Sequence, residues 1–84
     1  MTIKIEVFST DSCPHCPSAE RVAEEAKNEL NDIDLEIVKI NSEENRQRAI
    51  NYGIMAVPTI VINGQVAFTG APTKEQLIER LKSL

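Results

Sequence analysis

Two cysteines, three positions apart, are the residues of this chain whose type and spacing could do chemistry. They stand in the run Cys13-Pro14-His15-Cys16. A disulfide between them would close a very short loop, and chain-entropy stabilisation grows with loop length, so a structural staple is a poor explanation. In a reducing compartment, disulfides are transient and catalytic more often than structural. The pair therefore predicts thiol–disulfide exchange.

The two cysteines are expected to play different roles, because the pair lies at the junction where the first predicted strand ends and the first helix begins. Unpaired N–H groups and the helix dipole favour a thiolate there, and the thiolate is the form that attacks disulfides. Cys13 is therefore the predicted nucleophile. Cys16 is one helical turn further on and deeper, so it is the predicted resolving residue, which attacks a mixed disulfide at Cys13.

The residues between the cysteines are candidates for tuning the redox pair. Pro14 suits the first position of the helix, because its φ is helical and its missing N–H would be unpaired anyway. His15 has two interpretations that stay open. Its imidazole could stabilise the Cys13 thiolate and make the disulfide more oxidising, or it could be an exposed histidine that changes little.

A metal site is the competing interpretation of these residues. Structural zinc takes four ligands, and the chain has no second cysteine pair and no histidine other than His15. We therefore expect neither a metal nor a bound cofactor.

Size and charge limit the other possibilities. With 84 residues, 42% of them hydrophobic, the chain is expected to form one domain over residues 1–84. Thirteen acidic against nine basic residues give a net charge of -4, and the basic residues are scattered, so a nucleic acid partner is not expected. Charges at every second position near the N-terminus predict neither a signal peptide nor a membrane span. We expect a cytoplasmic protein.

Hydrophobic periodicity predicts the elements that must position the cysteines. Strands are expected over residues 3–8, 35–40, 59–62 and 65–69, with the hairpin signal Asn63-Gly64 between the last two. The run Thr59-Ile60-Val61-Ile62 suits a strand buried on both faces. Phe8, Tyr52 and Phe68 are expected to pack in the core or the hairpin.

Three helices are expected between and after these strands. The first runs from Pro14 to about Leu30, with an apolar face that includes Ala19 and Ala23. The second is capped by Asn41 with Glu44 and ends before Gly53. The third is capped by Thr73 with Gln76, and its apolar residues are Leu77, Ile78, Leu81 and Leu84. The predicted class is α/β, a four-stranded mixed sheet with helices on both faces.

Two motifs together carry a resemblance to a known family. Cys13-Pro14-His15-Cys16 and the downstream run 52–60, Tyr-Gly-Ile-Met-Ala-Val-Pro-Thr-Ile, resemble the thioredoxin and glutaredoxin superfamily, and more closely the small archaeal thioredoxin-like or glutaredoxin-like redox proteins. The resemblance implies the βαβαββα thioredoxin fold and a cis bond before Pro58, next to the cysteines. It also implies that Val57, Pro58 and Thr59 bind an extended substrate segment.

The chain departs from the family at several positions. Val7 stands where thioredoxins have a buried aspartate that helps to deprotonate the resolving cysteine. Lys39 matches the lysine that forms an ion pair with this aspartate in thioredoxins. It is either that lysine, kept although its acidic partner is missing, or an ordinary lysine at the end of a strand. Glutaredoxins bind glutathione partly through a Gly-Gly and an acidic residue, but this chain has Gly70-Ala71-Pro72-Thr73. Tight glutathione binding is therefore not expected.

The resemblance implies a thiol–disulfide oxidoreductase that exchanges electrons with protein disulfides, most simply as a thioredoxin-like reductant. Its implied electron donor is a flavin-containing reductase of the thioredoxin-reductase type, and the chain is expected to be a monomer. Two alternatives stay open. They are glutathione-coupled glutaredoxin activity, and a non-catalytic metal-binding or adaptor module.

Overall fold

The elements follow one another as strand, helix, strand, helix, strand, strand and helix. The computed structural model describes residues 2–83, and within them it contains β1 (Ile3–Ser9), α1 (Cys16–Glu29), β2 (Ile33–Lys39), α2 (Glu43–Asn51), β3 (Thr59–Ile62), β4 (Gln65–Thr69) and α3 (Lys74–Lys82). The four strands of this region form one sheet in the order β2-β1-β3-β4. β1 is parallel to β2 and antiparallel to β3, which is antiparallel to β4. The predicted order and the mixed sheet are confirmed.

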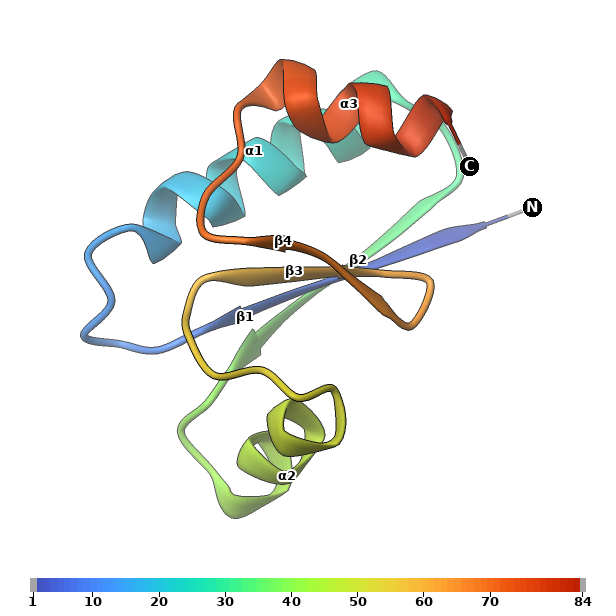
Figure 1. Ribbon diagram of the computed structural model, residues 1–84. Helices are drawn as coiled ribbons and strands as arrows, with labels where there is room; N and C mark the ends of the chain where they lie inside the picture. The colour runs from blue at the N-terminus through green and yellow to red at the C-terminus, as the bar shows by residue number, and fades with distance from the viewer. Residues whose placement is uncertain (1, 84) are drawn as a thin grey trace.

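The sheet is covered on both faces, as predicted. Figure 1 shows α1 and α3 on one face and α2 on the other. Successive side chains of β1 point to opposite faces, so Ile5 and Val7 pack with Ala19 and Ala23 of α1. Phe8 belongs to the second buried cluster, with Val38, Ala49 and Val61 beneath α2.

The hairpin and the central strand are also confirmed. Asn63 and Gly64 have φ values of 51° and 82°, the left-handed conformation that a tight hairpin turn between these strands requires. All four residues of β3 are buried. Phe8 is fully buried and meets Tyr52 edge to face, with ring centroids 5.7 Å apart, while Phe68 packs against the core under α1 and α3. The aromatic residues therefore pack as predicted.

Two boundaries differ from the sequence-based prediction. β2 begins at Ile33 rather than Leu35, because Ile33 pairs with Ile3 at the start of the parallel ladder. The cap of α2 is Ser42, whose side chain accepts a hydrogen bond from the Asn45 backbone N–H at 3.2 Å. The predicted Asn41 cap is therefore wrong by one residue.

The last helix agrees with the prediction where the structure describes it. The Thr73 side chain accepts from the Gln76 N–H, and the Gln76 side chain accepts from the Thr73 N–H, which completes the predicted capping box. Leu77 and Leu81 are buried, and Ile78 is partly buried, whereas Leu84 lies outside the described residues. None of the helices in residues 2–83 is long and apolar enough to cross a membrane.

Candidate active site

The cysteine pair lies at the end of the sheet where β1 finishes. After Ser9 the chain turns, with the Cys13 N–H donating to the Thr10 carbonyl at 3.4 Å, and α1 begins at Cys16. Cys13 and Cys16 are joined by a disulfide, with their Cα atoms 5.4 Å apart. Both sulfurs therefore lie at the N-terminus of α1, where unpaired backbone N–H groups favour negative charge.

The two cysteines differ in exposure. Cys16 is 1% exposed and belongs to the buried side of α1, whereas Cys13 is partly exposed. A substrate disulfide can therefore approach Cys13 from solvent but not Cys16. This asymmetry is the one that the predicted roles of nucleophile and resolving residue require.

The start of α1 corrects the prediction for Pro14. His15 is the N-cap, and the first helical hydrogen bond runs from the Ala19 N–H to the His15 carbonyl at 3.3 Å. Pro14 therefore lies before the helix, and Pro17 is the proline of the first turn, where a missing N–H costs no hydrogen bond. His15 is exposed, and its side chain makes no capping hydrogen bond.

The loop before β3 reaches the same end of the sheet. The Val57–Pro58 bond is cis, and Thr59 pairs with Phe8, one residue before the end of β1. Figure 1 shows this loop and the segment leading into α1 at the same end of the sheet. The fold thus brings two segments about forty residues apart in sequence to one end of the sheet.

The three residues implied to bind substrate have different surroundings. Pro58 is buried, and the buried Thr59 hydroxyl donates to the Ala56 carbonyl at 2.7 Å. Val57 is partly exposed, and its backbone N–H and C=O have no hydrogen-bond partner among residues 2–83. A strand-like segment of another chain could therefore pair with Val57.

Three polar side chains at the same end of the sheet as Cys16 escaped the sequence-based prediction or were left open there. Lys39 Nζ lies 3.6 Å from the Glu20 carboxylate on α1, so this lysine has an acidic ion-pair partner, although not one on β1. Ser9 is fully buried, and its hydroxyl has no hydrogen-bond partner in the described chain. Glu20 could have been found from its place four residues after Cys16 on the predicted helix.

A second cluster of polar side chains lies on the opposite face, under α2. Glu6 is 5% exposed, although strand alternation predicts a solvent-facing side chain there. Its carboxylate accepts hydrogen bonds from Arg48 at 2.6 Å and from the Tyr52 hydroxyl at 2.8 Å, and Arg48 also bonds Glu36. The Arg48 hydrogen bond lowers the pKa of Glu36, and the hydrogen bond to Glu6 raises the pKa of Tyr52.

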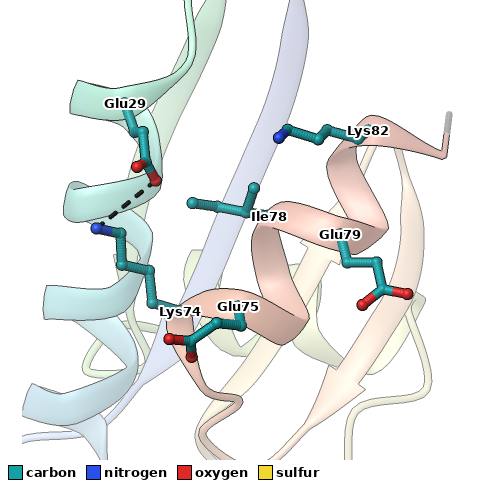
Figure 2. Close-up of a pocket in the computed structure, with 6 residues that line it drawn as sticks. All are labelled: Glu29, Lys74, Glu75, Ile78, Glu79 and Lys82. Atoms are coloured by element: carbon teal, nitrogen blue, oxygen red, sulfur yellow. Dashed lines mark ion pairs between the residues drawn. The ribbon is translucent and has the colours of Figure 1, made fainter.

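A cavity of about 450 Å³ lies away from the cysteines, between α1 and α3. Figure 2 shows its lining residues, Glu29, Lys74, Glu75, Ile78, Glu79 and Lys82. Glu29 is the last residue of α1, whereas Cys16 is the first, and Glu29 pairs with Lys74 at 3.6 Å. Neither cysteine lines this cavity. Within residues 2–83 there is also no group of three or more metal-ligating side chains.

Comparison with known proteins decides the family. A family model described as thioredoxin domain matches residues 1–82. The chain belongs to the thioredoxin family. It is 60% identical over 80 residues to a thioredoxin of Methanocaldococcus jannaschii. The aligned region covers 95% of this chain and 93% of the relative. It is 52% identical over 82 residues to a probable thioredoxin of Methanothermobacter marburgensis, covering 96% of this chain and 94% of the relative.

Solved structures agree on the fold. A thioredoxin-2 described as a component of the malaria parasite protein secretion machinery superposes with a TM-score of 0.84. The superposition covers 99% of this chain and 84% of the other at 18% identity, so it concerns the fold alone. The thioredoxin-family membership and the Cys13–Cys16 disulfide together identify the chain as a thiol–disulfide oxidoreductase.

Proposed function

We propose that this thioredoxin-family chain is a reductant of protein disulfides in which Cys13 is the nucleophile and Cys16 the resolving residue. The observation that carries the proposal is the disulfide between a partly exposed Cys13 and a Cys16 that is 1% exposed at the first residue of α1. Only the Cys13 sulfur is exposed enough to contact a bulky substrate. The buried Cys16 sulfur then releases the substrate by attacking the mixed disulfide at Cys13.

The proposal extends to the substrate and to the electron donor. The substrate segment pairs with the Val57 backbone beside Pro58 and Thr59, which favours extended chains over particular sequences. The donor is a flavin-containing reductase of the thioredoxin-reductase type, supported by relatives named thioredoxin. The chain acts as a one-domain monomer in the cytoplasm, where a reduced thiol pool suits a reductant.

Replacing the resolving cysteine tests the assigned roles. In Cys16→Ser the attack by Cys13 still occurs, but the mixed disulfide has no internal thiol to resolve it. Incubation of the reduced variant with native, disulfide-bonded insulin is therefore expected to trap a covalent adduct that dithiothreitol releases, detected by mass spectrometry. Cys13→Ser is the matched control and should trap at least about tenfold less, because its remaining thiol is buried.

Three outcomes would contradict the proposal. Equal trapping by Cys13→Ser would contradict the assignment of separate roles to the nucleophile and the resolving residue. Turnover of a glutathione mixed disulfide at the rate of a true glutaredoxin, in a reductase-coupled assay, would replace the thioredoxin-like role with a glutaredoxin role. An absence of any adduct with Cys16→Ser would favour an adaptor that binds its partner without exchange.

A further inference from the structure

Polar side chains gather on the α1 face of the sheet at the end where Cys16 is buried. Alternation along β1 turns Ser9 toward the same face as Ile5 and Val7, which pack against α1. Ser9 and Lys39 are direct neighbours in the parallel ladder of β1 and β2. The Ser9 and Lys39 side chains thus start from neighbouring positions on the face of the sheet that α1 covers.

Glu20 completes this group from the helix side. It follows Cys16 by four residues on α1, and side chains at this spacing are neighbours, with Cβ atoms about 5–6 Å apart. Helical side chains lean toward the N-terminus, so the Glu20 carboxylate extends over the turn that holds Cys16. The side chain is only 21% exposed, and its ion pair with Lys39 at 3.6 Å holds it on this side of the helix.

Ser9 has an unsatisfied hydroxyl at the same place. It is fully buried, and its Oγ has no hydrogen-bond partner among residues 2–83. Leaving a buried hydroxyl unpaired is unfavourable, and the buried sulfur at the same end of α1 belongs to Cys16. In the disulfide that sulfur is bonded to Cys13. A free thiol or thiolate, unlike a disulfide sulfur, is a group with which a hydroxyl readily forms a hydrogen bond.

The resolving step requires a group that accepts the proton of Cys16. Cys16 must lose its proton before it can attack, and burial disfavours the charged thiolate. We propose that Glu20, held by Lys39, receives the proton of Cys16, and that the Ser9 hydroxyl donates a hydrogen bond to the resulting thiolate. The assignment rests on the dithiol exchange proposed above, and it names an acid on α1 where the family pattern has one on β1.

The step balances in protons and electrons. The Cys13 thiolate attacks a substrate disulfide, so a Cys13–substrate bond forms and the first substrate sulfur leaves as a thiolate. The Cys16 thiol then passes its proton to the Glu20 carboxylate, and its sulfur attacks the Cys13 sulfur. The Cys13–Cys16 bond forms, and the second substrate sulfur leaves with the electron pair and takes up a proton. Two electrons reach the substrate, and Glu20 returns its proton to solvent.

The charged groups around this site are few. Among the described residues, β2 contributes Lys39, and β3 contributes no titratable side chain. On β1, Glu6 points to the opposite face, where it is bonded to Arg48, so Ser9 is the polar residue that faces α1 at this end. His15 is exposed at the N-cap, before the first turn. The carboxylate nearest to Cys16 in the sequence of α1 is therefore Glu20.

A two-phase reaction separates attack from resolution. The reduced protein is mixed with one equivalent of the aromatic disulfide 5,5′-dithiobis(2-nitrobenzoate) in a stopped-flow instrument. Attack by Cys13 releases the first coloured thiolate, and resolution by Cys16 releases the second. Glu20→Gln is expected to slow the second phase at least about tenfold at neutral pH and to change its pH dependence, with the first phase unchanged. Ser9→Ala should slow the second phase by about three- to tenfold.

Matched variants separate proton transfer from a general loss of charge or fold. Glu24→Gln removes the same charge from an exposed position one turn further along α1 and should leave both phases at wild-type rates. Glu20→Asp keeps a carboxylate and should recover part of the second-phase rate. Thermal unfolding of each oxidised variant shows whether the fold is kept.

Three results would overturn the assignment of Glu20. They are a second phase in Glu20→Gln with wild-type rate and pH dependence, an equal slowing of both phases, and an equal slowing in Glu24→Gln. Failure of the function itself has a different signature. In that case the wild-type protein would release only one coloured thiolate and would not reduce insulin, and both proposals would fall together.

Discussion

The sulfurs of Cys13 and Cys16 are close in sequence but differ in their surroundings. Cys13 is partly exposed before the helix, whereas Cys16 is buried against the sheet, with Glu20, Lys39 and Ser9 at the same end. A thiol at a helix N-terminus gains stabilisation of its thiolate, and a buried thiol loses it. At the scale of single residues, the disulfide therefore joins a reactive sulfur to a protected one.

His15 is predicted to have little influence on the reduction potential. It is exposed, and its side chain makes no hydrogen bond to the N-terminus of α1. An exposed charge is strongly screened, so His15→Gln should move the potential by less than about 30 mV, which corresponds to about 1.4 kcal/mol for two electrons. Equilibration in dithiothreitol redox buffers measures this potential, with Asp11→Asn as the exposed control.

The same titration tests the direction of exchange. A wild-type potential near about -270 mV, the thioredoxin end of the known range, supports a reductant, and one near about -120 mV would point to disulfide formation instead. A shift well above 30 mV in His15→Gln, with none in Asp11→Asn, would show that the imidazole does set the potential.

At the scale of elements, α2 is held against the sheet by a partly buried cluster of charged side chains. Arg48 of α2 bonds Glu6 of β1 and Glu36 of β2, and the Tyr52 hydroxyl at the end of the helix bonds the other oxygen of Glu6. The Phe8 ring packs edge to face against Tyr52. The centre of the same ring lies 5.9 Å from the Arg48 guanidinium carbon, which sits over the ring face. These contacts hold α2, and with it the chain that continues into the Val57–Pro58 loop.

Removing the cation of this cluster is expected to destabilise the fold. Arg48→Met leaves Glu6 buried with one hydrogen bond fewer and no counter-charge. The free energy of unfolding should fall by about 2–3 kcal/mol, less than for a fully buried pair because Arg48 is about one-third exposed. Denaturant unfolding measures the change. Arg46→Met, which removes the exposed pair with Glu43, is the control and should change it by less than about 1 kcal/mol. Equal effects of the two substitutions would contradict this role for the cluster.

At the scale of the whole molecule, the same cluster links stability to pH. The pKa of Glu36 is lowered in the folded state, chiefly by the Arg48 hydrogen bond, from an ordinary value of 4.5. Below pH 4.5 the unfolded chain binds this proton more readily than the folded one does. The stabilisation from Glu36 is therefore complete above that pH and is lost as the pH falls through the lower, folded-state pKa.

At alkaline pH, the contribution of the cluster to stability changes in the opposite direction and falls as the pH rises. The pKa of Tyr52 is raised above its ordinary value of 10.0, chiefly by the hydrogen bond to Glu6, so its contribution is complete below pH 10 and is lost as the pH rises further. Denaturant unfolding at a series of pH values should show both losses. Glu36→Gln should remove part of the acid loss, and Tyr52→Phe part of the alkaline loss. Unchanged profiles in both variants would contradict the prediction.

Much of the fold could be predicted because its signals are local. Apolar periodicity marked the helices and strands, Asn63-Gly64 marked the hairpin, and Thr73 with Gln76 marked the cap of α3. Each depends on residues a few positions apart. The errors fell at element ends, as with the Ser42 cap and the start of α1 at Cys16, because local sequence signals place helix ends only to within one or two residues.

By itself, the sequence determined the order of the elements, the mixed sheet and the cysteine pair with its redox chemistry. It indicated a cis bond before Pro58 only through the family resemblance, since most bonds before proline are trans. The tertiary structure decided that Glu6 is buried under α2, that Glu20 pairs with Lys39, and that the Ser9 hydroxyl is enclosed without a partner. These features join residues from different strands and helices, so their burial and partners arise only when the layers pack.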